Sequence, residues 1–231
     1  MILHLTKRTR LLSKLTTTTT YLLSQTRKMR LPYIQNPPPP STPENDAIVT
    51  RIQQRRHPRP LQPLDLTLLH SPPVANGWNS FLGAIRTQTL LSADLRELAI
   101  SRVAVVNRAW YEWAHHAPLA ISGGVSKEGM EAIKTEEPLV FGQTERPEGL
   151  TEKQWIVGCF TDEMTRNVQV RDETFEALKR VMGEDDGVEE KERDRLVVEV
   201  VSTVACYNCV SRFLVALDVG ERNGTGPDAA H

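Results

Sequence analysis

The stretch AWYEWAHH, residues 109–116, places one acidic and two basic side chains inside an otherwise apolar run. Glu112 and His116 are four residues apart, so on a helix they share a face and their side chains can meet. A carboxylate beside an imidazole orients the ring and raises its pKa, which suits a general base or proton carrier near neutral pH. The spacing therefore predicts acid–base chemistry centred on His116. The alternative is an amphipathic surface helix, and His115, which points elsewhere on the helix, is expected at the surface or an interface.

A second carboxylate, Glu97, lies in the preceding apolar run, RELAISRVA. A carboxylate directed towards a core must be paired, and a histidine from the next helix is a natural partner. We therefore expect Glu97 to join Glu112 in orienting His116. The alternative is that Glu97 forms the polar edge of its own helix and pairs with Arg96 or Arg102.

The segment 207–212 weakly repeats the residue spacing of the segment 111–116 inside another apolar run, which a duplicated helical unit would explain. The repeat predicts that Tyr207, Asn208 and Arg212 reach the same pocket from the last helix. Arg212 would then bind a substrate carboxylate through bidentate hydrogen bonds.

Trp110 and Trp113 flank Glu112 at helical spacing. Together they can wall an apolar pocket for a ring or an acyl chain, although aromatic residues at this spacing also occur as core. We expect one of them in the core and predict that Trp113 contacts the substrate.

These side chains need a scaffold, and the hydrophobic periodicity predicts a helical one. From about Leu66 onward, apolar residues recur at three- and four-residue spacing with few alternating β-branched runs, which indicates an all-α domain. The valine-rich VVEVV belongs to an apolar stretch of over twenty residues without a turn signal, so its length favours a helix. Predicted helix N-caps are Ser92, Ser126 and Thr151, the last in a capping box with Gln154, and Gly123–Gly124 is a predicted helix end.

Proline dominates the segment before this domain. The four successive prolines in NPPPPSTP, residues 36–43, lack N–H donors and fix φ near the polyproline II value. RRHPRPLQPLD continues this character. We therefore expect residues 29–65 to form an extended arm that wraps the body, residues 66–220 the domain, and residues 221–231 a disordered tail.

The segment RELAISRVAVVNRAWYEWAHHAPLA resembles the signature of the carboxymuconolactone decarboxylase and alkylhydroperoxidase D (AhpD-like) superfamily. In its redox branch the signature reads Glu, eleven residues, then Cys-x-x-Cys-x-x-x-His. Glu97 and His116 occupy the glutamate and histidine positions, whereas Ala109 and Glu112 stand where the cysteines would be. The resemblance extends over about residues 66–220, through GWNSFLGAIRTQ and YNCVSRFLVAL, and it is with the branch that lacks the Cys-x-x-Cys.

The resemblance implies an AhpD-like bundle of stacked helical hairpins, a homo-oligomer (trimer or hexamer), a small-molecule substrate and no cofactor. Peroxidase chemistry in the redox branch needs an attacking thiolate and a resolving cysteine, so it is disfavoured here. Acid–base chemistry remains, as on the decarboxylase side of the superfamily: decarboxylation or proton transfer on a small carboxylate or lactone, with His116 as the proton carrier. One alternative is a non-catalytic helical oligomer that binds a small molecule.

The other alternative is a thiol peroxidase that uses CYNC, the Cys206–Cys209 pair in the last apolar run. A redox role requires an exposed, acidified thiol, usually at a helix N-terminus or beside a cation. This pair lies in the middle of a predicted helix among Val, Ala and Leu, although Arg212 follows one turn later. We expect the two cysteines to serve as small buried hydrophobes.

The whole-chain composition excludes several other classes. In 231 residues, 28 Lys+Arg balance 29 Asp+Glu, so the total charge indicates no nucleic-acid partner. The sequence contains no Gly-rich phosphate loop, zinc-ligand spacing or serine nucleophile elbow, and no metal is expected. No apolar run approaches the roughly 20 uncharged residues of a membrane span. Three cysteines are too few for a secreted disulfide framework, so a reducing compartment fits better.

Residues 1–28 are rich in Thr, Leu and basic residues and contain no acidic residue. That composition is typical of a mitochondrial presequence. The alternative is an upstream extension of a protein that effectively begins at Met29. The predicted location is therefore mitochondrial or cytoplasmic, and the segment is excluded from the fold.

Overall fold

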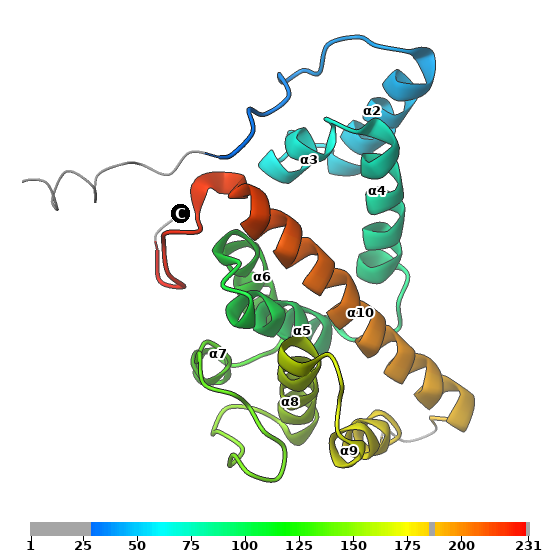
Figure 1. Cartoon of the computed structure of the whole chain (residues 1–231). Helices are drawn as coiled ribbons and strands as arrows, with labels where there is room; N and C mark the ends of the chain where they lie inside the picture. Colours follow the sequence, from blue (N-terminus) through cyan, green and yellow to red (C-terminus); the bar gives the residue numbers. More distant parts are fainter. Residues whose placement is uncertain (1–28, 185–187, 230–231) are drawn as a thin grey trace, which may run out of the picture.

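The computed structural model describes residues 29–184 and 188–229, which are helical and contain no strand (Figure 1). The predicted all-α fold is confirmed. The prediction for residues 1–28 lies outside the described residues. The helices are α2 (Pro43–Arg56), α3 (Pro63–Leu68), α4 (Pro72–Thr87), α5 (Ala93–Val106), α6 (Trp110–Gly123), α7 (Lys127–Ile133), α8 (Glu152–Asn167), α9 (Asp172–Met182), α10 (Glu190–Leu217) and the short 3-10 helix η1 (Val219–Glu221).

Local capping chemistry sets several of these helix starts. Ser126 caps α7, where its Oγ accepts the N–H of the residue three positions on at 2.9 Å. Thr151 and Gln154 form the predicted capping box of α8, in which each side chain accepts the other residue's N–H, at 3.2 and 3.1 Å. Ser92 is the N-cap residue of α5, but its side chain makes no capping bond. Gly124 ends α6 with φ +120°, a conformation open to glycine because it has no Cβ.

Helix α5 lies at the centre of the bundle, packed against α6, α7, α8 and α10. Leu98, Ile100 and Val103 are fully buried although they point in different directions, as expected for a helix that is apolar on all sides. A short turn through Arg108, whose φ is +53°, reverses the chain into α6. Glu97 and His116 lie at similar separations from this turn, so the α5–α6 hairpin places them opposite each other.

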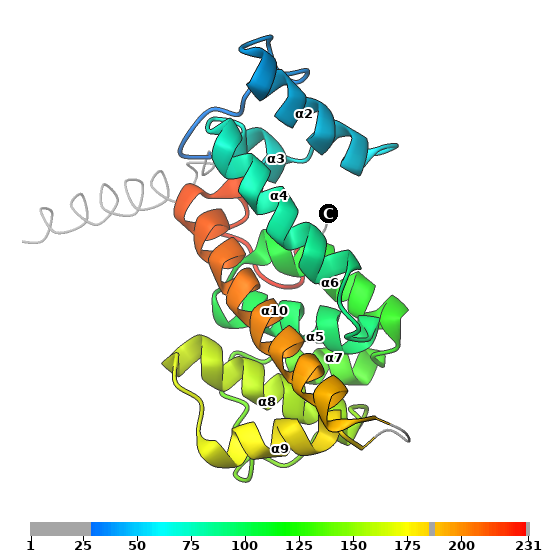
Figure 2. The same cartoon turned by 90° about the vertical axis from the view of Figure 1, so that its right-hand side faces the viewer.

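The longest helix, α10, has 28 residues and crosses the molecule from α9 to the C-terminal segment (Figure 2). By length and composition alone it qualifies as a membrane span, contrary to the prediction that no apolar run is long enough. The core helix of a soluble protein passes the same test. In the structure, α10 packs against α4, α5, α6, α8 and α9.

A buried ion pair connects α5 to α8. Arg102 is fully buried and its Nε donates to Asp162 Oδ2 of α8 at 2.7 Å. Arg166 Nε occupies the other oxygen of Asp162 at 2.7 Å. Other N–H groups of Arg102 donate to backbone carbonyls at and after the end of α7, those of Ile133, Thr135 and Glu137.

The structure differs from the predicted extended arm over residues 29–65. Residues 43–56 form α2, which begins at Pro43 directly after Thr42, whose Oγ1 accepts the N–H of Asn45 at 3.3 Å. Proline breaks a helix in its interior, but it fits the first helical turn, where no N–H partner is needed. The part before α2 does run along the body, because Arg30 N donates to Leu217 O at 3.0 Å.

The described part of the predicted disordered tail also has a defined position. Trp113 Nε1 donates to Pro227 O at 3.0 Å, and Lys134 pairs with Asp228 at 2.8 Å. Residues 221–229 therefore lie against α6 and the end of α7. No local sequence pattern indicates this contact, because the partners are more than ninety residues apart.

Candidate functional site

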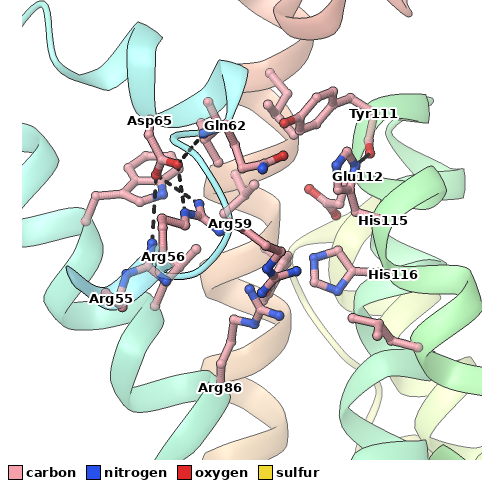
Figure 3. Close-up of a pocket in the computed structure, with 17 residues that line it drawn as sticks. Arg55, Arg56, Arg59, Gln62, Asp65, Arg86, Tyr111, Glu112, His115 and His116 are labelled. Carbon is pink, nitrogen blue, oxygen red and sulfur yellow. Dashed lines mark hydrogen bonds and ion pairs between the residues drawn. The ribbon is translucent and has the colours of Figure 1, made fainter. Parts of the chain in front are cut away.

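A cavity of about 100 Å³ opens between α6 and α10 on one side and α2, α3 and α4 on the other (Figure 3). His116 and Glu112 reach it from α6, and Tyr207 reaches it from α10. The opposite wall contributes charged residues that are not among the predicted site residues. These are Arg55, Arg56, Arg59, Asp65 and Arg86.

Glu97 and His116 form a direct pair, with 2.6 Å between Glu97 Oε2 and His116 Nδ1. Both residues are buried, at 4% and 8% exposure. The expected pairing of Glu97 with His116 is present. Arg96 adds a longer contact of 3.4 Å from its Nε to the other oxygen of Glu97. Arg102, the remaining alternative partner, pairs with Asp162 instead.

The environment of this pair fixes its protonation state. Burial is the strongest influence on Glu97 and favours the neutral acid, but His116, Arg86 and Arg96 together outweigh it and lower the pKa of Glu97. Burial likewise lowers the pKa of His116, and Glu97 offsets this only partly. At neutral pH the imidazole is therefore neutral, with its Nδ1–H donating to the ionised Glu97 carboxylate. The lone pair of Nε2 is then available to a molecule in the cavity.

Glu112 has a different partner from the one predicted. It is 2% exposed, and Ser211 Oγ of α10 lies 3.0 Å from each of its carboxyl oxygens and donates to it. Burial raises the pKa of Glu112 well above its ordinary value, with Ser211 opposing the shift. Burial thus favours the protonated acid of Glu112 beside a neutral histidine. Orientation of His116 thus falls to Glu97, while Glu112 is bonded to Ser211.

Tyr207 lines the cavity as predicted. Its ring meets the His116 ring edge-on, with 5.0 Å between ring centroids and 81° between ring planes. Its hydroxyl is buried and has no hydrogen-bond partner within the described residues. Burial raises the pKa of Tyr207, so the hydroxyl keeps its proton and can donate it in a hydrogen bond.

The structure does not bring Asn208 and Arg212 into this cavity. Asn208 Nδ2 donates to Thr165 Oγ1 at 3.0 Å, and Arg212 Nη1 donates to Asn208 Oδ1 at 2.6 Å. The reason is the packing of α10: Asn208 and Arg212 are four residues apart and share a face that meets Thr165 of α8, whereas Tyr207 faces the cavity. The predicted carboxylate-binding role of Arg212 therefore lacks its geometry.

Trp113 is also outside this cavity. It is buried, and together with Trp110 it lines a separate hollow closed by the C-terminal segment around Pro227. His115, expected at the surface, is exposed; its ring lies on Tyr111 at 4.4 Å between centroids, and it borders the cavity.

The arginines are the part of the site that sequence reasoning missed. Three of them occur within RRHPR, residues 55–59, at and after the end of α2. Asp65 binds Arg56 at 2.7 Å and lies 3.8 Å from Arg55. The cluster of arginines was a visible signal, but the proline-rich surroundings led to its assignment to an extended arm.

The cysteines lie elsewhere. Cys206 and Cys209 border an apolar hollow beside Trp78 and Phe81 of α4 rather than the cavity around His116. Burial raises the pKa of Cys206 to about 12, which opposes thiolate formation. Cys209 is exposed. In the described part of the chain, no group of three His, Cys, Asp or Glu residues could hold a metal ion.

Comparisons with known proteins agree with the fold and the signature. The model of the carboxymuconolactone decarboxylase family matches residues 72–146, which contain Glu97, Glu112 and His116. No curated protein matches the chain in sequence.

Two similar solved structures are peroxidase-related proteins without an assigned function. One is described as an alkylhydroperoxidase AhpD core protein from Ralstonia eutropha JMP134, with TM-score 0.60 and 16% identity over 83% of this chain and 90% of that one. The other comes from Silicibacter sp. TM1040, with TM-score 0.60 and 16% identity over 86% of this chain and 98% of that one. At this identity they show the shared fold. Residues 72–146 are thus similar to the carboxymuconolactone decarboxylase family, with Glu97 and His116 at the glutamate and histidine positions of the signature and Ala109 and Glu112 where its redox branch has cysteines.

Proposed function

We propose that this protein is an acid–base catalyst that carries out proton transfer or decarboxylation on a small carboxylate or lactone. The observation that carries the proposal is the Glu97–His116 pair, 2.6 Å apart, at a cavity that also contains Glu112. Two ionisable groups with opposite protonation preferences at one cavity are the usual arrangement for a general base and a general acid.

His116 acts as the base. Its Nε2 removes a proton from the substrate, and the imidazolium that forms is stabilised by the Glu97 carboxylate at Nδ1. The negative charge that develops on a substrate oxygen, as in an enolate, needs donors nearby. The Tyr207 hydroxyl and the protonated Glu112 can supply them, and Glu112 can deliver its proton to the carbon or oxygen that needs it. Solvent exchange then returns both groups to their starting states.

The position of the sulfur atoms argues against the thiol peroxidase alternative. A peroxidase needs a thiolate where the peroxide binds. Ala109 and Glu112 contain no sulfur, and Cys206 and Cys209 border a different hollow. The alternative of a non-catalytic protein that only binds a small molecule is distinguished from catalysis by the following experiment.

The test is incubation of the full chain with a metabolite extract in deuterated water, followed by mass spectrometry for deuterium uptake and carbon dioxide loss. The comparison is His116→Gln, and the matched control is Arg212→Gln, which alters a residue outside the cavity. We expect a product with the unaltered protein and the control, reduced about 100-fold or more in His116→Gln. Equal product with His116→Gln excludes the proton-carrier role. No product in any sample, together with a retained ligand, favours the binding-only alternative.

A trimer or hexamer and a mitochondrial or cytoplasmic location remain part of the proposal. Light scattering of the purified protein tests the former, and imaging of the full chain against one that begins at Met29 tests the latter.

A further inference from the structure

We propose that Arg59 and Arg86, together with the Tyr207 hydroxyl, form a receptor for an oxyanionic group, of which a carboxylate is the expected form, on the small molecule that enters the cavity. The inference rests on the proposed function, because it concerns the same cavity. It replaces Arg212, which lies elsewhere, with residues that line the cavity.

The first support is an unbalanced charge. Four arginines line the cavity, and Asp65 is the carboxylate on the same wall. Asp65 is already fully used, because it binds Arg56 at 2.7 Å, lies 3.8 Å from Arg55 and accepts the N–H of Gln62 at 2.8 Å. Arg59 and Arg86 have no ion pair with any carboxylate in the described ranges. The wall therefore presents positive charge that only a ligand neutralises.

The second support is convergence. Arg59 follows α2 and Arg86 belongs to α4, yet Figure 3 shows both side chains directed towards the space in front of His116. The charge of Arg86 acts on Glu97, His116 and Tyr207. Like charges that converge from separate segments repel each other. An anion between them converts that repulsion into attraction, and the planar guanidinium matches the two oxygens of a carboxylate.

The third support is the Tyr207 hydroxyl, a buried donor without a partner at the same cavity. Buried polar groups are almost always hydrogen-bonded, because an unmade bond is destabilising. A ligand oxygen held by the arginines would accept this hydrogen bond. The cavity volume of about 100 Å³ restricts the enclosed part of the ligand to a small group such as a carboxylate with a few attached carbons.

The receptor combines residues inside and outside the segment that matches the family model. Arg86 and His116 lie within the matched residues 72–146, whereas Arg59 precedes them. The helices α2 and α3 thus supply a wall of the cavity, and this wall is where the chain selects its ligand.

The experiment is isothermal titration calorimetry of the full chain with acetate, succinate and inorganic phosphate, in a buffer without other oxyanions. The variants are Arg59→Gln, Arg86→Gln and Tyr207→Phe. Arg51→Gln is the matched control, because Arg51 is an α2 arginine that does not line the cavity. Thermal unfolding of each variant verifies that it is folded.

We expect saturable binding of a carboxylate to the unaltered chain. Each arginine variant should bind about 10-fold more weakly or worse, and Tyr207→Phe about threefold more weakly. Arg51→Gln should stay within about twofold, since distant exposed charges are screened. Stronger binding of phosphate than of either carboxylate also supports the receptor and identifies a phosphate ester as the ligand class. No binding of any probe, or equal weakening in Arg51→Gln, overturns the proposal.

The same titration with His116→Gln separates the two proposals. Retained carboxylate binding alongside lost deuterium uptake supports both the receptor and the catalytic role. Specific binding by an unaltered protein that never exchanges deuterium leaves the receptor established and the catalytic proposal refuted. Deuterium uptake that is unchanged by Arg59→Gln and Arg86→Gln overturns the receptor while the catalytic proposal stands.

Discussion

Helix α5 carries two buried charged side chains, Arg102 and Glu97, whose surroundings differ. Arg102 donates to Asp162 and to backbone carbonyls, and Arg166 takes the other oxygen of Asp162, so donors and acceptors in this cluster are matched. Glu97 holds one nitrogen of His116, while the other nitrogen faces a cavity. We call the first the closed cluster (Arg102, Asp162, Arg166) and the second the open cluster (Glu97, Glu112, His116, Tyr207).

The difference indicates the role of each cluster. A buried polar network with every group satisfied holds a fold together, and its charges have no capacity left for a ligand. The open cluster retains the Tyr207 hydroxyl without a partner, a neutral imidazole and a protonated carboxyl group beside a cavity. Unused hydrogen-bonding capacity and opposed protonation preferences at a cavity are what a catalytic site needs.

The largest effect is expected in the closed cluster. Arg102→Gln leaves Asp162 buried without its main partner, so we expect a loss of about 3–5 kcal/mol in the free energy of unfolding. Urea unfolding followed by circular dichroism measures it. A loss below about 1 kcal/mol would remove the structural role assigned to this cluster.

In the open cluster, Glu97→Gln should mainly affect catalysis. It removes the carboxylate that orients His116 and supports its pKa, so we expect turnover of the substrate found by deuterium uptake to fall about 100-fold. The acid limb of the pH–rate profile should move to lower pH, because the pKa of His116 falls further when Glu97 is neutral. Asp162→Asn is the matched control: it should reduce stability without moving that limb. If the acid limb of Glu97→Gln does not move, the Glu97–His116 pair does not set the pKa of His116.

Glu112→Gln should stabilise the protein while lowering its activity. The folded-state pKa of Glu112 is raised above the unfolded value, so its contribution to stability is present below pH 4.5, the ordinary value, and is lost as the pH rises towards the folded pKa. The variant, which can keep the Ser211 hydrogen bond, escapes that loss. Its melting temperature should match that of the unaltered chain at pH 4 and exceed it by about 3 °C or more at pH 7.5. A constant difference across this range would argue that Glu112 is ionised in the fold.

The smallest effect is expected from substitution of a cysteine. Cys209→Ser alters an exposed residue outside the cavity, so turnover should stay within about twofold and stability within about 0.5 kcal/mol. Mass spectrometry after peroxide treatment should show no Cys206–Cys209 disulfide. A disulfide that forms rapidly, with turnover lost in Cys209→Ser, would restore the thiol peroxidase alternative.

Local sequence signals were sufficient for much of the scaffold. Helix periodicity, the Thr151–Gln154 box and the Ser126 cap depend on residues three or four apart, and each appears in the structure as predicted. The prediction that the proline-rich segment is extended was wrong, because α2 and α3 both begin with proline in the first turn. The wrong placement of Asn208 and Arg212 came from treating the residue spacing of 207–212 as equivalent to that of 111–116, although α10 packs so that Asn208 meets Thr165 of α8.

The sequence by itself determined the all-α fold, the helix boundaries set by caps, and the opposition of Glu97 and His116 across a short hairpin. These depend on chain-local hydrogen bonding and on a turn that reverses direction between the two residues. Only the tertiary structure decided that Glu112 meets Ser211, that Arg102 meets Asp162, and that Arg59 and Arg86 share a cavity with His116. Those contacts join residues from nearly thirty to a hundred positions apart, and burial, which sets their protonation states, exists only once the helices have packed.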